Sequence, residues 1–150
     1  MRKPLTALLT AGAVLVAGAG ATVLTAGPAM AGHEVTVLTT KLDGKNEVPT
    51  KGDPNGRGKA TVFGVDGNPD RLCYTLKVSK IDTATGAHIH EAAEGVNGPV
   101  VVSLAPPSDG DSAGCVDTPL AQEILSSPQD YYVNVHNAEY PGGALRGQLG

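Results

Sequence analysis

Short runs of alternating sequence, each ended by a glycine or proline turn, are the feature that most constrains this fold. Val, Ile, Thr and Tyr recur in these runs, and such residues favour strands, in which successive side chains point to opposite faces. Turns rich in Gly, Pro, Asn and Asp separate the runs, for example at 52–56, 66–69 and 141–143. Seven runs are predicted to form strands, at residues 33–42, 60–65, 71–78, 86–91, 99–104, 131–136 and 144–149.

Glycine and proline also limit the helical content. The 20 glycines and 11 prolines among 150 residues interrupt long helices, so helical bundles and coiled coils are disfavoured. Only residues 119–126 are expected to form a helix, with Thr118 as its N-cap and Pro119 in its first turn. Alternating rather than continuous apolar patterns favour antiparallel pairing. The predicted fold is therefore an all-β, antiparallel Greek-key β-sandwich or barrel with one short helix.

The first 31 residues have the pattern of a signal peptide. A positive segment, Met1-Arg2-Lys3, precedes an apolar run at 5–26, and Ala29-Met30-Ala31 supplies a small-x-small cleavage site. We expect cleavage after Ala31, which leaves a secreted, extracellular domain of residues 32–150 that is not bound to a membrane. The alternative is an uncleaved membrane anchor, since the apolar run is long enough to span a bilayer. The Gly27-Pro28 break and the lack of positive charge after the run favour cleavage.

Charge and sulfur content limit the partners and the compartment. Eleven Lys and Arg residues stand against 15 Asp and Glu, giving a net charge of −4, so no nucleic-acid partner is predicted. Cys73 and Cys115 are the two cysteines, and in an exported protein they are expected to form one disulfide. Met1 and Met30 leave with the signal peptide, which excludes a Met-ligated Cu(I) site in the mature domain.

Three histidines form the candidate site. His88 and His90 lie two residues apart in a predicted strand, so their imidazoles project from one face, about 6–7 Å apart at the Cα atoms. His136 is the expected third member, since it lies with Tyr132 and Asn134 on the polar face of another predicted strand. Three imidazoles and a water suit Cu(II) or Zn(II), with metal–nitrogen distances of about 2.0–2.1 Å. The prediction depends on the two strands lying close together.

Other charged residues have supporting roles in this hypothesis. Glu91, Glu94 and Glu139 are near the histidines in sequence and are candidates for a fourth ligand or for hydrogen bonds to the ligands. Arg146 is expected to form a salt bridge from the last strand, with contact to a partner as the alternative. The histidines themselves have an alternative role as exposed or hydrogen-bonded structural imidazoles.

No known catalytic pattern is present in the sequence. Residues 66–70 begin like a calcium loop, but Arg71 stands where Gly is needed and Lys77 where a bidentate Glu is needed, so a hairpin turn is predicted. A nucleophile elbow, a P-loop and a dinucleotide fingerprint are all missing. Catalytic activity is therefore not predicted.

Four blocks of sequence, in order along the chain, resemble the CHRD domain, a module named for chordin and also found singly in secreted bacterial proteins. The blocks are 42–49 (LDGKNEVP), 56–60 (GRGKA), 87–102 with its AHIH segment, and 131–149, which runs from YYVNVH to PGGALRGQL. The resemblance implies one extracellular domain that covers almost the whole mature chain. Chordin is an extracellular antagonist of bone morphogenetic proteins, but its cysteine-rich modules are missing here, so growth-factor binding is not carried over.

Two functional hypotheses follow from these observations. The first is a secreted binding or interaction module with an unknown extracellular or cell-wall partner. The second is a Cu(II)- or Zn(II)-binding protein that uses His88, His90 and His136. Stoichiometric metal on the purified protein distinguishes the second hypothesis from the first.

Overall fold

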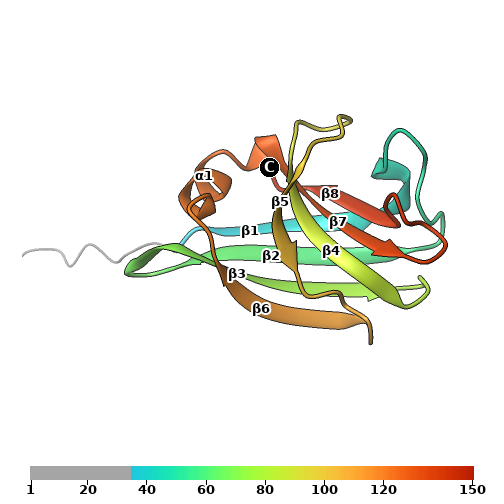
Figure 1. Ribbon diagram of the computed structural model, residues 1–150, viewed down its shortest axis with the longest axis horizontal. Helices are drawn as coiled ribbons and strands as arrows, with labels where there is room; N and C mark the ends of the chain where they lie inside the picture. The colour runs from blue at the N-terminus through green and yellow to red at the C-terminus, as the bar shows by residue number, and fades with distance from the viewer. Residues whose placement is uncertain (1–34) are drawn as a thin grey trace, which may run out of the picture. The chain divides into compact units, whose positions relative to one another are not determined.

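The computed structural model describes residues 35–150, most of which belong to eight antiparallel strands (Figure 1). The predicted signal peptide and His33 lie outside the described residues. The strands are β1 Val37–Asp43, β2 Arg57–Val65, β3 Asn68–Ser79, β4 Ala84–Glu91, β5 Val100–Leu104, β6 Asp111–Asp117, β7 Tyr131–Asn137 and β8 Leu145–Gln148. The helices are α1 Ala121–Ser126 and two short 3-10 helices, η1 Gly44–Asn46 and η2 Pro128–Asp130. All seven predicted strands and the predicted helix are present, so the all-β prediction is confirmed.

The strands form one sheet that is folded into a nearly closed barrel. Their order is β5-β4-β7-β8-β1-β2-β3-β6, with antiparallel neighbours throughout. β8 and β1 are joined at one register pair, Asp43 with Arg146, whereas the other neighbouring strands share at least four pairs. The sheet therefore divides into two halves, named here for their central strands: the β4/β7 half (β5, β4, β7, β8) and the β2/β3 half (β1, β2, β3, β6).

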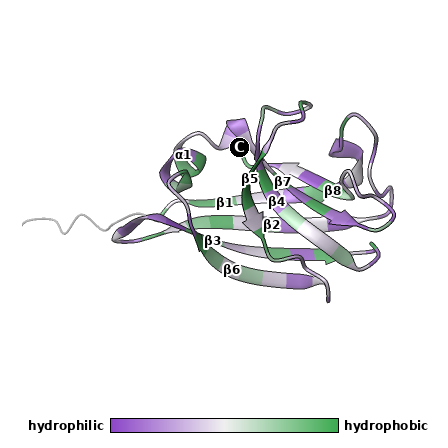
Figure 2. Ribbon diagram, viewed as in Figure 1, coloured by the Kyte–Doolittle hydropathy of each residue, from purple (hydrophilic) through white to green (hydrophobic). Residues whose placement is uncertain are grey.

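Side-chain alternation packs the two halves against each other. Both halves contribute buried side chains to one hydrophobic cluster. Figure 2 shows hydrophobic and hydrophilic residues alternating along single strands, as a sheet with one buried face requires. The β2/β3 half contributes Leu42, Ala60, Val62, Leu72, Tyr74 and Leu76, and the β4/β7 half contributes Ala87, Ile89, Val133 and Val135.

Side chains of β3 and of the edge strand β6 contact the end of the other edge strand, β5. The Tyr74 hydroxyl accepts a hydrogen bond from the backbone N–H of Ala105, directly after β5, at 2.7 Å. The Ser112 hydroxyl on β6 donates to the carbonyl oxygen of Ala105 at 2.8 Å. The Ser112 bond joins the two edges in place of a backbone ladder, and the Tyr74 bond adds a contact from β3, so the barrel is close to closure.

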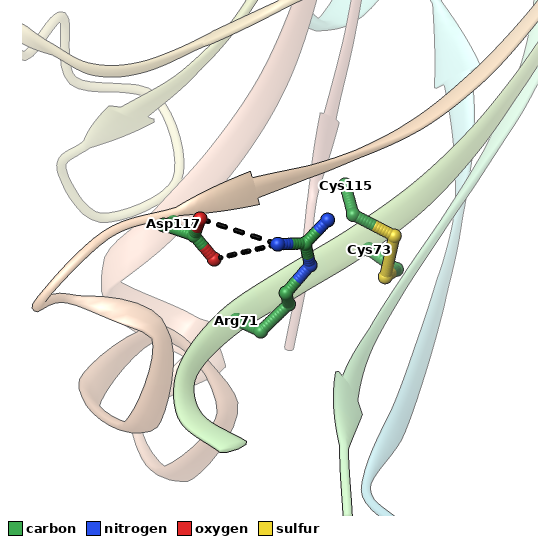
Figure 3. The surroundings of a disulfide bond; sticks show 4 residues. All are labelled: Arg71, Cys73, Cys115 and Asp117. Carbon is green, nitrogen blue, oxygen red and sulfur yellow. Dashed lines mark hydrogen bonds and ion pairs between the residues drawn. A yellow bond between two sulfur atoms is a disulfide. The ribbon is translucent and has the colours of Figure 1, made fainter.

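A disulfide links β6 to β3. Cys73 and Cys115 are directly opposite in the ladder, and their bond confirms the predicted pairing. Figure 3 shows the disulfide with the register pair two residues further along, in which Arg71 donates to both carboxylate oxygens of Asp117 at 3.1 and 3.2 Å. β6 was not predicted: none of the seven predicted ranges covers it. Its sequence, DSAGCVD, has few of the β-branched and aromatic residues that favour strands.

The start of α1 differs from the prediction. The helix begins at Ala121 with Leu120 in the cap position, so Thr118 is not its N-cap. Instead, the Thr118 hydroxyl accepts a bond from Leu120 N at 3.3 Å, and the Thr118 carbonyl accepts one from Ala121 N at 3.1 Å. Pro119 and Leu120 therefore form a turn before the helix. The hairpin turn predicted at residues 66–70 is confirmed between β2 and β3, but it is confined to Asp66-Gly67, because β3 begins at Asn68.

Candidate metal centre

The three predicted histidines come together on the outer face of β4 and β7. Ladder pairing places His88 beside Asn134 and Gly86 beside His136, so the two strands lie next to each other as the prediction required. His88 Nδ1 lies 3.1 Å from His136 Nε2, and the ring centroids of His88 and His90 are 5.8 Å apart. One ring nitrogen from each histidine lies within 4.8 Å of the others. Three potential ligand atoms therefore converge on one point.

Two backbone carbonyls orient the imidazoles. His90 Nδ1 lies 2.9 Å from the carbonyl oxygen of Gly98, and His136 Nδ1 lies 3.0 Å from that of Pro141. A carbonyl oxygen only accepts, so both Nδ1 atoms carry the proton and both Nε2 atoms present a lone pair. The lone pair on His136 Nε2 accepts a hydrogen bond from His88 Nδ1. The Nε2 atom of His90 is buried and has no hydrogen-bond partner in the described structure. Carbonyls that fix the tautomer in this way are typical of histidines that ligate metals.

Burial keeps the three imidazoles neutral. Desolvation is the largest cause that lowers the pKa of His88, His90 and His136. Repulsion by neighbouring imidazoles lowers the pKa of His88 and His136 further, and the Arg146 guanidinium lowers the pKa of His90. The hydrogen bonds to Gly98 and Pro141 oppose the shift only in part. At neutral pH each ring therefore keeps one nitrogen lone pair, and a metal bound by all three histidines would replace the hydrogen bond between His88 Nδ1 and His136 Nε2.

The separations suit one tetrahedral ion after a small adjustment of the rings. Metal–nitrogen bonds of about 2.0–2.1 Å at tetrahedral angles place ligand nitrogens about 3.3 Å apart. The 3.1 Å between His88 and His136 is close to this value, and the widest separation, within 4.8 Å, requires rotation of a side chain. Gly86 faces the rings of His88 and His136 and has no side chain to fill the space beside them. Three nitrogens with a free fourth position can hold Cu(II) or Zn(II).

The acidic residues named from the sequence are not part of this cluster. Glu91, Glu94 and Glu139 are exposed, and within residues 35–150 the group that can hold a metal consists of the three histidines alone. Glu91 follows His90 on β4, and strand alternation directs its side chain to the opposite face.

A stack of three side chains supports His90. Its ring is parallel to the Tyr132 ring, with centroids 4.7 Å apart and planes 10° apart. The guanidinium carbon of Arg146 lies 3.4 Å from the centroid of the same Tyr132 ring. Cation–π attraction across such a contact strengthens when the pair is shielded from water, and Arg146 is only 1% exposed. Tyr132, predicted to lie on an accessible polar face, is buried too.

Arg146 also ties down the loop between β4 and β5. Its guanidinium donates to the carbonyl oxygens of Val96 at 2.8 Å and Ala93 at 3.3 Å, and to Asn97 Oδ1 at 3.4 Å. The expected salt bridge is not observed: within the described residues, no carboxylate lies close enough to pair with Arg146. The loop held in this way carries Gly98, whose carbonyl orients His90.

Glu47 is a buried carboxyl group that the sequence did not single out. It is 2% exposed, and Asn134 Nδ2 donates to its Oε1 at 2.7 Å. Burial raises its pKa to about 7, against the attraction of Arg146 and the bond from Asn134, which lower it. Gly143 has a positive φ of 146°, and a side chain there would overlap the Glu47 carboxyl group. Only the 42–49 block, which contains Glu47, could have drawn attention to this residue.

These features define a class of protein: a small antiparallel β-barrel domain with three clustered histidines beside a buried arginine–tyrosine stack. Within the described residues, no helix is long and apolar enough to cross a membrane. The chain belongs to the CHRD domain family, whose model matches residues 38–149 and so includes the histidines, the disulfide, Glu47 and Arg146. CHRD domains are domains of the extracellular type. No curated protein and no solved structure matches the chain.

Proposed function

We propose that this chain is an exported, extracellular binding module that holds one Cu(II) or Zn(II) ion through His88, His90 and His136. The proposal includes removal of residues 1–31 as a signal peptide, which leaves the domain at 32–150. The Cys73–Cys115 disulfide supports it, because disulfides persist in oxidising compartments outside the cytosol. Membership of the CHRD family supports it as well.

One observation carries the metal hypothesis. The buried Nε2 atom of His90 has no hydrogen-bond partner among the described residues, yet it faces two other imidazoles whose ring nitrogens lie within 4.8 Å. A buried polar atom without a partner costs about 1–3 kcal/mol, and a bound cation removes this penalty. Cu(II) and Zn(II) are the divalent ions that accept three imidazoles most readily.

Metal analysis tests the proposal directly. Protein purified without chelators, loaded with Zn(II) or Cu(II) and then dialysed, is expected to retain one ion per chain by mass spectrometry of the metal. His88→Ala, His90→Ala and His136→Ala are each expected to weaken binding by about 100-fold or more, since loss of a ligand exceeds the loss caused by an outer hydrogen-bond partner. A folded wild-type protein that retains no stoichiometric ion after loading would contradict the proposal and leave an interaction module that binds no metal.

His33 provides the matched control. It is the fourth histidine of the chain, so His33→Ala removes one imidazole without altering the proposed centre. The ligand variants are best compared in a His33→Ala background for Cu(II), because His33 directly follows the amino-terminal residue Gly32 of the proposed mature domain, and a free amine beside an imidazole can bind this ion by itself. Equal loss of metal from His33→Ala and His90→Ala would contradict the assignment of ligands.

A further inference from the structure

A row of three lysines crosses the outer face of the β2/β3 half. Ladder pairing places Lys41 of β1 opposite Lys59 of β2, and Lys59 opposite Lys77 of β3. Directly paired residues point to the same face of a sheet, and all three lysines are exposed. Three ammonium groups therefore stand side by side on neighbouring strands, which are about 5 Å apart.

The row is electrostatically unfavourable for the isolated domain. Like charges directly opposite each other destabilise paired strands. Across the described residues, no ion pair joins any of the three lysines to a carboxylate; the pairs observed on this half link Asp43 to Lys45 and Arg57, and Asp117 to Arg71. Asp111 of β6 is directly opposite Lys77, but it forms no ion pair with it in the described structure, so the three ammonium groups remain without a carboxylate within ion-pair distance.

A row of hydroxyl groups runs parallel to the lysines. Two residues along each strand, on the same face, Thr39 is opposite Thr61, and Thr61 is opposite Thr75. The Thr39 and Thr61 hydroxyls are 3.2 Å apart and form a hydrogen bond. The two rows together form a strip of three ammonium and three hydroxyl groups, named here the Lys–Thr strip.

Acidic residues limit the width of the positive potential. Asp111 of β6 is opposite Lys77 and ends the lysine row, and Asp43 lies in the next row on the same face. A broad anionic surface such as a membrane would bring negative charge against these carboxylates. A narrow chain of anionic groups would contact the lysines and avoid them.

We infer that the Lys–Thr strip binds a linear polyanion that carries phosphate groups. Lysine ammonium groups bind phosphate as point charges, and threonine hydroxyls donate to phosphate oxygens. The strip offers no stack of aromatic side chains for bases, so a phosphate polymer without nucleobases fits it better than a single-stranded nucleic acid. This inference does not depend on the metal centre, which lies on the other half of the barrel.

Medium-chain inorganic polyphosphate is the probe for this inference, with binding followed by calorimetry. Wild-type protein is expected to bind it, and the affinity is expected to fall about 15-fold between about 50 and 200 mM salt, since release of three counterions gives a logarithmic slope of about −2. Lys59→Gln, at the centre of the row, is expected to weaken binding about fivefold and to reduce the slope by about 1. The triple variant Lys41→Gln/Lys59→Gln/Lys77→Gln is expected to abolish binding and to keep its metal.

Lys80→Gln provides the control, because Lys80 is exposed beyond the end of β3 and its loss changes the net charge equally. A twofold or smaller effect of Lys80→Gln supports the inference, whereas an effect equal to that of Lys59→Gln overturns it. No binding at about 50 mM salt, or binding of anionic vesicles without binding of polyphosphate, overturns it as well. Tighter binding of oligothymidylate than of polyphosphate at equal phosphate number assigns the strip to nucleic acid and overturns it in this form.

Discussion

The two halves of the barrel follow the same side-chain alternation, yet their outer faces have opposite environments. Asp43 is paired in register with Arg146 of β8 on one side and with Arg57 of β2 on the other. Arg146 is 1% exposed and is surrounded by carbonyl oxygens and the Tyr132 ring. The Arg57 side chain is 55% exposed and lies 3.9 Å from the Asp43 carboxylate. Two arginines in one ladder row thus have unlike surroundings.

Loops, and not strands, make the difference. The β4–β5 loop covers the outer face of the β4/β7 half, and its carbonyls satisfy a cation that would otherwise be buried without partners. In the described structure the β2/β3 half has no such cover over Lys41, Lys59 and Lys77. Alternation decides which way a side chain points, and the loops decide whether that direction leads to solvent. The comparison predicts that equivalent substitutions on the two halves have unequal effects.

The largest expected effect is that of Arg146→Met. Loss of the guanidinium leaves the Ala93 and Val96 carbonyls without their donor and is expected to lower the free energy of unfolding by about 4 kcal/mol. Arg57→Met, the matched variant on the β2/β3 half, is expected to change the free energy of unfolding by less than about 1 kcal/mol. Denaturant unfolding measures both. If Arg146→Met fails to fold, Arg146→Lys is expected to show a partial loss, and equal costs at positions 57 and 146 would contradict the comparison.

The second effect concerns the disulfide of the β2/β3 half. The Cys73→Ala/Cys115→Ala double variant is expected to lose about 3 kcal/mol of stability, since a cross-link over 42 residues restricts the unfolded chain. Its metal affinity is expected to match that of the wild-type protein, because the histidines lie on the other half. Denaturant midpoints and metal titration check the two statements. Loss of metal from a folded double variant would show that the halves are coupled.

The third effect depends on pH. The pKa of Glu47 is raised to about 7 by burial, so between pH 4.5 and about 7 the folded protein holds a proton that the unfolded chain releases. Stability conferred by this proton is present below pH 4.5 and is lost as the pH rises through 7. The free energy of unfolding of Glu47→Gln, relative to that of the wild type, is therefore expected to rise by about 2 kcal/mol as the pH is raised from 5 to 8. Unfolding curves of both proteins across this range check the change, and a difference that does not vary with pH would contradict it.

The smallest effect is a gain in the stability of the domain when a lysine is removed from the outer face of the β2/β3 half. Lys59→Gln removes two like-charge contacts, with Lys41 and Lys77, and is expected to stabilise the domain by about 0.3 kcal/mol at low salt. The gain is expected to disappear in about 1 M salt, where surface charges are screened over about 3 Å. Thermal unfolding at the two salt concentrations measures it. A loss of stability at low salt would show that the lysines have favourable contacts on this face.

The sequence predicted the strands and the histidine cluster because both depend on alternation. His88, His90 and His136 were assigned to outer faces by strand period, and the adjacent pairing of β4 and β7 brings them together. The disulfide was predicted because the chain is expected to be exported and its two cysteines allow one pairing. β6 was missed by position, since its strand conformation comes from the ladder with β3 and not from its own residues.

The burial of polar groups beside the histidine cluster, and the β4–β5 loop that covers them, could not be predicted from the sequence. Arg146 was expected to find a carboxylate, but its partners are main-chain oxygens of a loop 50 residues away, which no side-chain pattern encodes. The burial of Glu47 could not be predicted either, because its hydrogen-bond partner Asn134 is 87 residues away in the sequence. Burial of polar groups depends on such long-range contacts, whereas strand period is local.

The Nδ1–H groups of His90 and His136 donate hydrogen bonds to the main-chain oxygens of Gly98 and Pro141. An exchange of one amino acid for another leaves a main-chain oxygen in place, whereas an insertion or deletion in either loop moves it. Residue 98 is an exception, because a side chain there would overlap the Glu91 carbonyl. Natural variants that keep the imidazole arrangement are therefore expected to conserve the lengths of these two segments more strictly than the residue types within them.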